Sequence, residues 1–261
     1  MTIHEYGKEH EKLVLLIHPS VVMWDYFEQL IPLLENKCRL VIPALPGYDP
    51  DQKGDFTGIE PIAAEIEDWL IAHALSRVDC VYGCSMGGSV IMRMLAGRRL
   101  HIKAALIDGG ITPYRLPWLI TRLIAVKDFL TVYIGKLGGI RLLQRAFTTD
   151  EYTEEDLQYV AGVLRMMSAR TIWRTFESCN NYAMPNPVRT NCREIEYLYA
   201  ATEEKARKKD LAYVREHFPH ARFRKMENIG HGGLAVRKPE ILAECIERML
   251  AFPDQSQTDT S

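Results

Sequence analysis

A single stretch, Val78–Gly88 (VDCVYGCSMGG), decides the fold. Its first five residues form a short apolar run that predicts a buried strand, and Ser89–Gly97, which follows, has helical spacing. Between strand and helix, Gly83–Gly87 fits the pattern Gly-x-Ser-x-Gly. Such a turn holds its serine in strained backbone, and its small flanking residues let neighbouring backbone pass close by. A plain glycine-rich turn is the alternative, but the flanking strand and helix favour Ser85 as a nucleophile.

Further apolar runs and amphipathic segments alternate on both sides of this stretch. The predicted strands are Lys12–His18, Cys38–Pro43, Ile102–Ile107, Ile195–Tyr199 and Ala221–Met226. The predicted helices are Tyr26–Leu34, Ile62–Ala74, Lys205–Phe218 and Pro239–Phe252. Alternation of this kind predicts an α/β fold with a mostly parallel sheet covered by helices on both faces.

The alternation stops between residues 111 and 188, where the pattern is almost wholly helical and rich in aromatic residues. This segment is much longer than an ordinary crossover, so we expect a helical cap inserted above the carboxyl ends of the strands, where open parallel sheets bind ligands. Residues 1–110 and 189–252 are then the core domain. The polar residues 253–261 are expected to be a disordered tail.

His231 is the candidate general base, because a serine hydroxyl is a poor nucleophile until a base removes its proton. It lies in the sequence Gly-His-Gly-Gly at 230–233, after the last predicted strand. A histidine taken alone in a loop is more often a surface residue. Its position downstream of Ser85 and at a strand end favours the catalytic interpretation.

A carboxylate should orient the imidazole and stabilise its cation. Glu203 follows the predicted strand Ile195–Tyr199 and is the preferred candidate, although it could also belong to a solvated charged run at 203–210. Asp108, at the end of the strand Ile102–Ile107, is the alternative acid, and Glu204 is a third option.

The oxyanion of the tetrahedral intermediate needs two backbone N–H donors. Met86, the residue after the nucleophile, would supply one. The loop after the strand Lys12–His18 should supply the other, and Ser20 is the candidate because Pro19 has no N–H.

Composition limits the class of protein. The 261 residues are 47% hydrophobic and 25% charged, which suits one large α/β domain with an insertion. The net charge of -2 provides no basic excess for nucleic acid. The six cysteines show no CxxC and no regular spacing, which predicts reduced, mostly buried thiols in a cytoplasmic protein.

Membrane insertion is not expected. The first residues, MTIHEYGKEHEKL, lack the basic and apolar regions of a signal peptide. The most apolar stretch, Leu116–Val132, is interrupted by Arg122, Lys127 and Asp128, whereas a transmembrane helix needs about 20 mostly apolar residues. Contact of residues 117–132 with a membrane surface is a minor alternative.

Taken together, these motifs resemble the α/β-hydrolase superfamily, specifically its members with a helical cap. His18-Pro19 is similar to the family's His-Gly at the oxyanion loop, and Phe27–Leu34 and Val41–Gly47 are similar to the helix and turn that follow it. Ser85, Glu203 and His231 fall where the family places nucleophile, acid and base, in the family's order. The resemblance covers nearly the whole chain.

Three positions depart from the family pattern. Pro19 replaces the usual glycine, and Ala44 stands where the family usually has aspartate. Ala200 stands where a glycine often begins the acid turn, which then carries glutamate rather than aspartate at Glu203. The last departure keeps Asp108 open as the acid.

The residues and the resemblance imply a serine hydrolase that forms an acyl-enzyme on Ser85, with no metal or organic cofactor. An ester, thioester, amide or activated C–C bond fits this nucleophile, whereas capped relatives that open epoxides use aspartate. The expected substrate is a small to medium, partly apolar molecule. A ligand-binding, receptor-like protein on the same fold and an acyltransferase are the alternatives. The oligomeric state stays open.

Aromatic residues of the insertion have two interpretations. They pack the cap helices together, or a few of them line an apolar substrate pocket. The insertion contains Trp118, Phe129, Tyr133, Phe147, Trp173, Phe176 and Tyr182. The pocket candidates among them are Trp118, Phe129, Tyr133 and Trp173.

Overall fold

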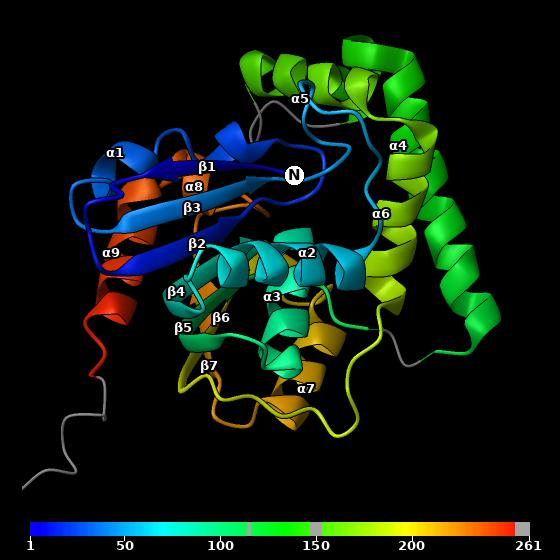
Figure 1. Cartoon of the computed structure of the whole chain (residues 1–261). Coiled ribbons are helices and arrows are strands. Elements are labelled where there is room, and N and C mark those ends of the chain that lie inside the picture. Colours follow the sequence, from blue (N-terminus) through cyan, green and yellow to red (C-terminus); the bar gives the residue numbers. More distant parts are fainter. Residues whose placement is uncertain (114–115, 147–152, 254–261) are drawn as a thin grey trace, which may run out of the picture.

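A seven-stranded sheet forms the centre of the molecule in the computed structural model, which describes residues 1–113, 116–146 and 153–253 (Figure 1). The strands are β1 (Thr2–Tyr6), β2 (Leu13–Ile17), β3 (Arg39–Ala44), β4 (Arg77–Cys84), β5 (His101–Asp108), β6 (Glu194–Ala200) and β7 (Arg222–Met226). Their order across the sheet is β1-β3-β2-β4-β5-β6-β7. β1 is antiparallel to β3, and the other neighbouring pairs are parallel. The predicted α/β fold with a mostly parallel sheet is confirmed.

The central strands are apolar on both sides because helices cover both faces of the sheet. In β2, Leu15 and Ile17 point into one hydrophobic cluster, and Val14 and Leu16 point into the other. One face is covered by α2 (Ile59–Ala72), α3 (Met86–Gly97) and α7 (Lys208–His217). The other is covered by η1 (Trp24–Phe27), α1 (Ile31–Leu34), α8 (Leu234–Arg237) and α9 (Pro239–Leu250).

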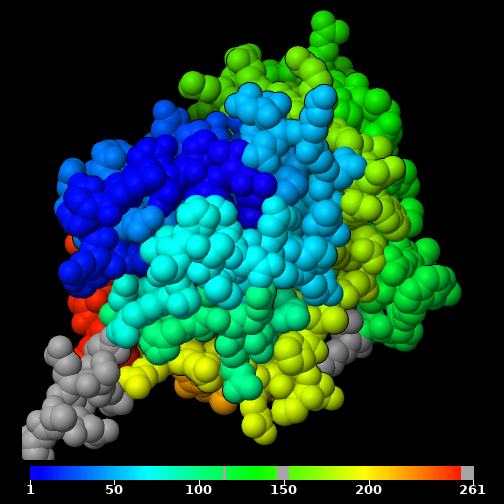
Figure 2. Space-filling model, viewed as in Figure 1, coloured from blue at the N-terminus to red at the C-terminus, as the bar shows by residue number. Residues whose placement is uncertain are grey.

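Three helices occupy the segment between β5 and β6: α4 (Trp118–Ala146), α5 (Glu154–Met166) and α6 (Ala169–Asn181). Helix α4 bends at Gly139, whose φ of 58° and ψ of -156° are not helical. α6 packs against α2 and α3 of the core, and α4 packs against α5 and α6. As a result α4 lies outermost, and its green atoms form the right edge of the molecule (Figures 1 and 2).

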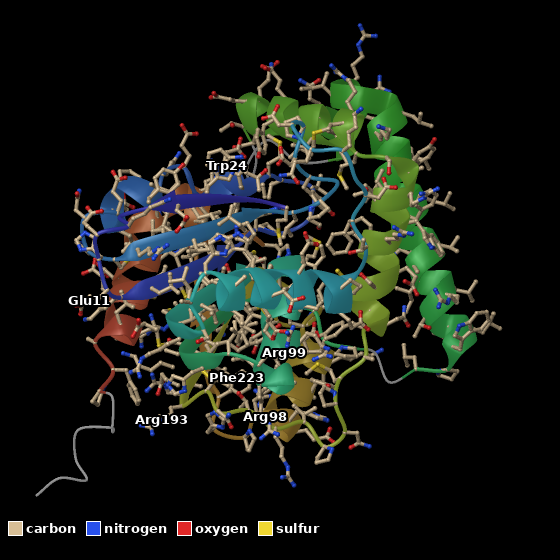
Figure 3. The ribbon with its side chains drawn as sticks, in the orientation of Figure 1. Glu11, Trp24, Arg98, Arg99, Arg193 and Phe223 are labelled. Carbon is tan, nitrogen blue, oxygen red and sulfur yellow. The ribbon has the colours of Figure 1, made fainter. Side chains whose placement is uncertain are left out.

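Several segments differ in detail from their prediction. The helix expected over Tyr26–Leu34 is split into η1 and α1, and the helix expected from Lys205 begins at Lys208. Strand β1 was not predicted, because its residues are only half-buried and form no apolar run. The edge strand is held partly by Trp24, which is labelled in Figure 3. Its ring stacks on His4 with ring centroids 3.6 Å apart.

The described ranges decide which of the remaining sequence predictions can be compared with the structure. Phe147 and all but the first residue of the expected disordered tail lie outside the described residues. All six cysteines are described, and all are buried. Among the described helices, none is both long enough and apolar enough to cross a membrane.

Candidate active site

Ser85 lies on the sharp turn between β4 and α3. Its φ of 52° and ψ of -112° put a residue with a side chain in left-handed backbone, which costs about 1–3 kcal/mol. The surrounding fold maintains this conformation: the Ser85 N–H donates to the carbonyl oxygen of Asp108 over 2.8 Å. The side chain is nearly buried, with 5% of the residue exposed. The turn therefore holds a strained, backbone-anchored serine, and the role of Ser85 as nucleophile stays a prediction.

Glycines beside Ser85 are required by close backbone contacts. A Cβ atom on Gly87 would overlap the carbonyl oxygen of Ile17 at the end of β2. A Cβ atom on Gly88 would lie 2.7 Å from the Cα of Gly110. The start of α3 is therefore pressed against the ends of β2 and β5, which brings the loops after these strands to Ser85.

His231 and Glu203 contact each other directly. The Nδ1 of His231 lies 3.0 Å from the Oε2 of Glu203, which follows β6 in the short helix η2 (Ala201–Glu203). Since a carboxylate only accepts, Nδ1–H is the donor, and the Nε2 of the neutral ring is left with a lone pair. Burial by itself would raise the pKa of Glu203, but the hydrogen bond and charge of His231, together with Arg207, bring it below its usual range.

Asp108 lies beside the same histidine but has a different partner. It accepts a hydrogen bond of 2.8 Å from the Tyr82 hydroxyl, and burial raises the pKa of its carboxyl. A Cβ atom on the next residue, Gly109, would lie 3.0 Å from the imidazole Cε1, so Asp108 is close to His231 in space. Glu204, the third candidate, is half exposed and pairs with Lys225.

Arg207 is part of the site although no sequence motif indicates it. Its guanidinium lies 3.1 Å from the Oε1 of Glu203 and 3.3 Å from the Nδ1 of His231, and it also pairs with Asp210. Its side chain is only 12% exposed. Burial alone would lower the pKa of Arg207, but Glu203 and Asp210 raise it, so the guanidinium stays charged. In the sequence it lies within the charged run at 203–210, which is typical of a solvated helix face.

Tyr26 fixes the loop that carries the histidine. Its buried hydroxyl donates to the carbonyl oxygen of Gly232 over 2.7 Å, one residue after His231. The same hydroxyl lies near the sulfur of Cys84, which is completely buried beneath the turn. The sequence suggested only helical spacing at Tyr26, and no local pattern links it to a residue 206 positions away.

The expected oxyanion donors lie at the adjoining ends of β2 and α3. Met86 is the first residue of α3, where backbone N–H groups have no partner within the helix. Ser20 is half-buried in the loop after β2, and Val21 beside it has a φ of 65°, a genuine outlier for a β-branched residue. His18 is fully buried; its Nδ1–H donates to the carbonyl oxygen of Pro19, and burial lowers its pKa to about 4.

The four aromatic residues predicted as pocket candidates do not form one group. Phe129 and Tyr133 of α4 stack with ring centroids 5.3 Å apart, and Trp173 of α6 contacts Phe129 edge-on at 5.8 Å. These three rings join α4 to α6. Trp118 is 68% exposed, with the guanidinium of Arg122 over its ring. A pocket-lining role stays a prediction for all four.

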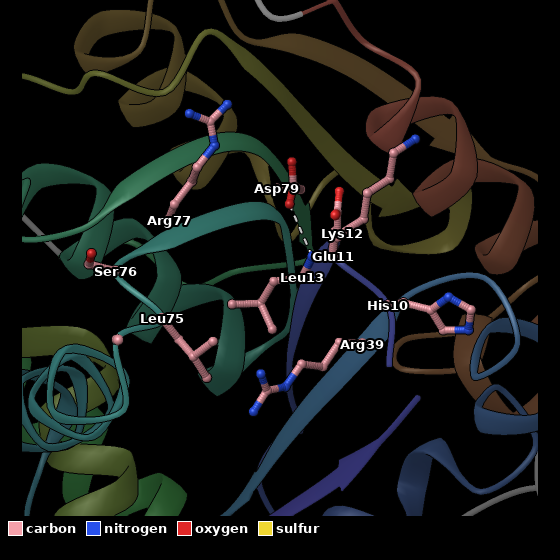
Figure 4. A pocket seen from close by; sticks show the side chains of 10 residues that line it. His10, Glu11, Lys12, Leu13, Arg39, Leu75, Ser76, Arg77 and Asp79 are labelled. Carbon is pink, nitrogen blue, oxygen red and sulfur yellow. Dashed lines mark hydrogen bonds between the residues drawn. The ribbon is translucent and has the colours of Figure 1, made fainter. Parts of the chain in front are cut away.

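A pocket on another part of the surface lies at the opposite ends of the strands. It is lined by residues at the starts of β2 and β4, including Leu13, Arg77 and Asp79, with Arg39 of β3 (Figure 4). The Leu13 N–H donates to the Asp79 carboxylate across it. Because Ser85 follows the other end of β4, this pocket is not part of the serine–histidine site.

A serine turn between a parallel strand and a helix, with a histidine–carboxylate pair in later strand-end loops, defines the α/β-hydrolase class. The sequence profile described as "Alpha/beta hydrolase family" matches residues 14–244, and the chain therefore belongs to this family. The comparison with curated proteins finds no match.

Solved structures with the same fold cover nearly the whole chain. An alpha/beta hydrolase family protein from Desulfitobacterium hafniense is 20% identical, with a TM-score of 0.74 over 95% of this chain and 100% of that one. The epoxide hydrolase CorEH is 18% identical, with a TM-score of 0.73 over 95% and 94%. A thermophilic esterase from Thermogutta terrifontis is 14% identical, with a TM-score of 0.71 over 95% and 92%. At these identities the likeness establishes the fold. Membership of the family supports hydrolase activity.

Proposed function

We propose that the protein is a serine hydrolase that cleaves a carboxylic ester, or a thioester or amide, of a small to medium, partly apolar substrate. The observation that carries the proposal is the 3.0 Å contact between His231 Nδ1 and Glu203, in loops beside the strained turn of Ser85: a Cβ atom on Gly232 would lie 3.8 Å from the Sγ of Cys84. In this assignment Ser85 is the nucleophile, His231 the general base and Glu203 the orienting acid. Tyr82 already occupies the Oδ2 of Asp108, which supports the choice of Glu203.

The reaction has two halves. In the first, His231 Nε2 takes the proton of the Ser85 hydroxyl as the oxygen attacks the substrate carbonyl, and then gives it to the departing alcohol, thiol or amine. In the second, water loses a proton to the same nitrogen as it attacks the acyl-enzyme, and that nitrogen then returns the proton to the departing Ser85 oxygen as the acid is released. Glu203 stabilises the imidazolium in both halves, and the N–H groups of Met86 and Ser20 are the proposed donors to the oxyanion.

The serine also distinguishes between reaction classes found on this fold. One structural neighbour is named an epoxide hydrolase and another an esterase. Capped relatives that open epoxides use an aspartate nucleophile, so Ser85 favours acyl chemistry. Helices α4 to α6 are the proposed cap, and the half-buried rings of Phe129, Tyr133 and Trp173 are the candidates for contact with the apolar part of the substrate.

The decisive experiment labels the purified protein with a fluorophosphonate probe and follows release of p-nitrophenol from acetate, butyrate and octanoate esters. We expect labelling and turnover in the wild type and neither in Ser85→Ala, with the same circular dichroism spectrum for both. Labelling without turnover would favour a ligand-binding protein or an acyltransferase with another acceptor. Folded protein that neither labels nor turns over any ester would contradict the catalytic assignment.

A further inference from the structure

The solvent-facing side of α4 is unusually apolar. Nine large hydrophobic side chains are exposed among the described residues, and all but Ile71 of α2 belong to α4. The eight are Trp118, Leu119, Ile120, Leu123, Val126, Leu130, Ile134 and Leu137, with exposed fractions from 40% to 71%. Exposed apolar residues scattered singly need no explanation, but a contiguous group indicates a surface that another body covers.

The exposed residues form one stripe. From Ile120, which follows Leu119 directly, to Leu137 they recur every three or four positions, which is the spacing of one helix face. Eighteen residues of helix extend about 27 Å, so the stripe follows most of α4 before the bend at Gly139. A surface helix normally turns such a stripe toward the core. Here the buried residues Thr121 and Ala125 are on the other side of the helix, which packs on α5 and α6.

The charges of α4 are arranged around this stripe and are almost all basic. Asp128 is the only acidic residue between Trp118 and Arg145, and it lies two positions from Leu130, on the opposite side of the helix. Of the charged residues from 118 to 138, only Lys127 is exposed, and the others are half-buried. Beyond the bend at Gly139, the helix adds exposed Arg141 and Arg145.

Two other charged residues of α4 are already engaged within the molecule. Arg122 pairs with Glu177 of α6. Lys136 donates to the carbonyl oxygens of Leu164, Arg165 and Met167 at the end of α5. The charges that interrupt the apolar stretch in the sequence are therefore, apart from Lys127, directed away from the exposed stripe.

We propose that this face of α4 docks on an anionic membrane surface. The helix would lie in the plane of the interface, with its apolar stripe in the acyl boundary and its basic side chains at the phosphate level. Lys127 suits this position because its long stem can follow the apolar surface while its ammonium group stays with the headgroups. An anionic surface complements this face, because its exposed charge is Lys127, exposed Arg141 and Arg145 follow beyond the bend, and it carries no exposed carboxylate.

Charge also argues against a second copy of the chain as the occupant. A symmetric antiparallel pair of α4 helices centred on the stripe would place its dyad near residue 128, the midpoint of 119–137. Lys127 of each copy would then lie beside Lys127 of the other, because residues next to a dyad meet their own equivalents. Two ammonium groups side by side along the edge of an apolar contact would repel each other, whereas a membrane accepts both.

The test measures cosedimentation with large unilamellar vesicles of phosphatidylcholine alone and with 30% phosphatidylglycerol. We expect the wild type to bind the anionic vesicles, more weakly as salt is raised. Leu123→Glu/Leu130→Glu should weaken binding at least tenfold, since each leucine loses its place in the acyl boundary. Lys127→Glu should weaken it about fivefold or more. Ile71→Glu, on the exposed apolar residue of α2, is the matched control and should bind as the wild type does.

Ser85→Ala should bind vesicles normally, so docking is measured separately from the proposed hydrolase. The substituted side chains are exposed, and circular dichroism with thermal unfolding checks that each variant is folded. The proposal is wrong if the wild type does not bind anionic vesicles, or if the double variant binds as well as the wild type. A wild-type dimer that binds no vesicles, and that Leu123→Glu/Leu130→Glu converts to a monomer, would instead assign the face to a second copy.

Discussion

At the scale of single residues, two carboxylates lie near one histidine in different surroundings. Glu203 contacts the imidazole and Arg207, whereas Asp108 is buried and accepts from Tyr82. The isosteric pair Glu203→Gln and Asp108→Asn therefore separates them. We expect kcat/KM to fall about 10³–10⁴-fold in Glu203→Gln, because the amide no longer stabilises the imidazolium. Asp108→Asn should keep activity within about threefold, since an amide oxygen still accepts from Tyr82.

Hydrolysis of p-nitrophenyl butyrate measures this difference, and the rate of fluorophosphonate labelling gives a second readout. The reverse ranking, with Asp108→Asn inactive and Glu203→Gln active, would make Asp108 the acid despite its position. Equal large losses would mean that the two carboxylates act together.

Glu203 and Asp108 should contribute to stability with opposite pH dependence. The folded-state pKa of Glu203 is lowered, so its ionisation stabilises the fold above its unfolded pKa of about 4.3, and this contribution is lost as pH falls. The folded-state pKa of Asp108 is raised by burial, so its contribution is present below about 3.9 and is lost as pH rises. Urea unfolding should show that the deficit of Glu203→Gln is larger at pH 7 than at pH 4.

For Asp108→Asn the change has the other sign. Relative to the wild type, this variant should gain stability between pH 4 and pH 7, because asparagine cannot acquire the unfavourable buried charge. If the difference in stability between Asp108→Asn and the wild type stays constant over this pH range, Asp108 has the same pKa in the folded and unfolded chains.

At the scale of elements, the site depends on how closely α3 approaches β2. Gly87→Ala would drive a methyl group into the carbonyl oxygen of Ile17, and we expect a loss of about 3 kcal/mol or more in the free energy of unfolding. Gly162→Ala is the control. Gly162 lies inside α5 with open space around its Cα, so alanine should stabilise the protein by about 0.5–1 kcal/mol.

Urea denaturation of both variants gives the comparison, with expression level and solubility as a first indication. If Gly87→Ala were as stable as the wild type, α3 would have to move away from β2, and the proposed oxyanion donors, on α3 and in the loop after β2, would separate.

The elements that could be predicted from the sequence are those with a local apolar or helical pattern, including β7, none of whose residues is fully buried. β2 (LVLLI) has every residue buried, and the turn at Ser85 has a local motif that follows from its backbone strain. β1 was not predicted, because an edge strand can form without an apolar run. The roles of Arg207 and Tyr26 were not predicted, because they depend on partners that the tertiary fold brings together. A buried arginine within a charged run has no sequence signature.

At the scale of the whole molecule, we expect access to Ser85 to depend on how helices α4 to α6, the proposed cap, are held to the core. α6 is the helix among them that packs on α2 and α3, and Ser85 is only 5% exposed. One tie is the 2.6 Å hydrogen bond between the Tyr48 hydroxyl and the Oγ1 of Thr175, both fully buried. A second is the Phe56 N–H, which donates to Thr171 Oγ1. A reagent that reaches Ser85 should therefore require α6 to move.

Tyr48→Phe tests this dependence with the smallest change. The ring keeps its contacts with His18 and Phe56, while the loss of the hydroxyl leaves Thr175 without that partner. A cost of about 1–2 kcal/mol to the docking of α6 raises the open population roughly five- to thirtyfold. We expect fluorophosphonate labelling of Ser85 to accelerate by a similar factor, with faster hydrogen exchange in α6 and unchanged exchange in β4. Tyr6→Phe, on the edge strand, should change neither. Faster exchange in α6 without faster labelling would show that the route to Ser85 does not pass beneath this helix.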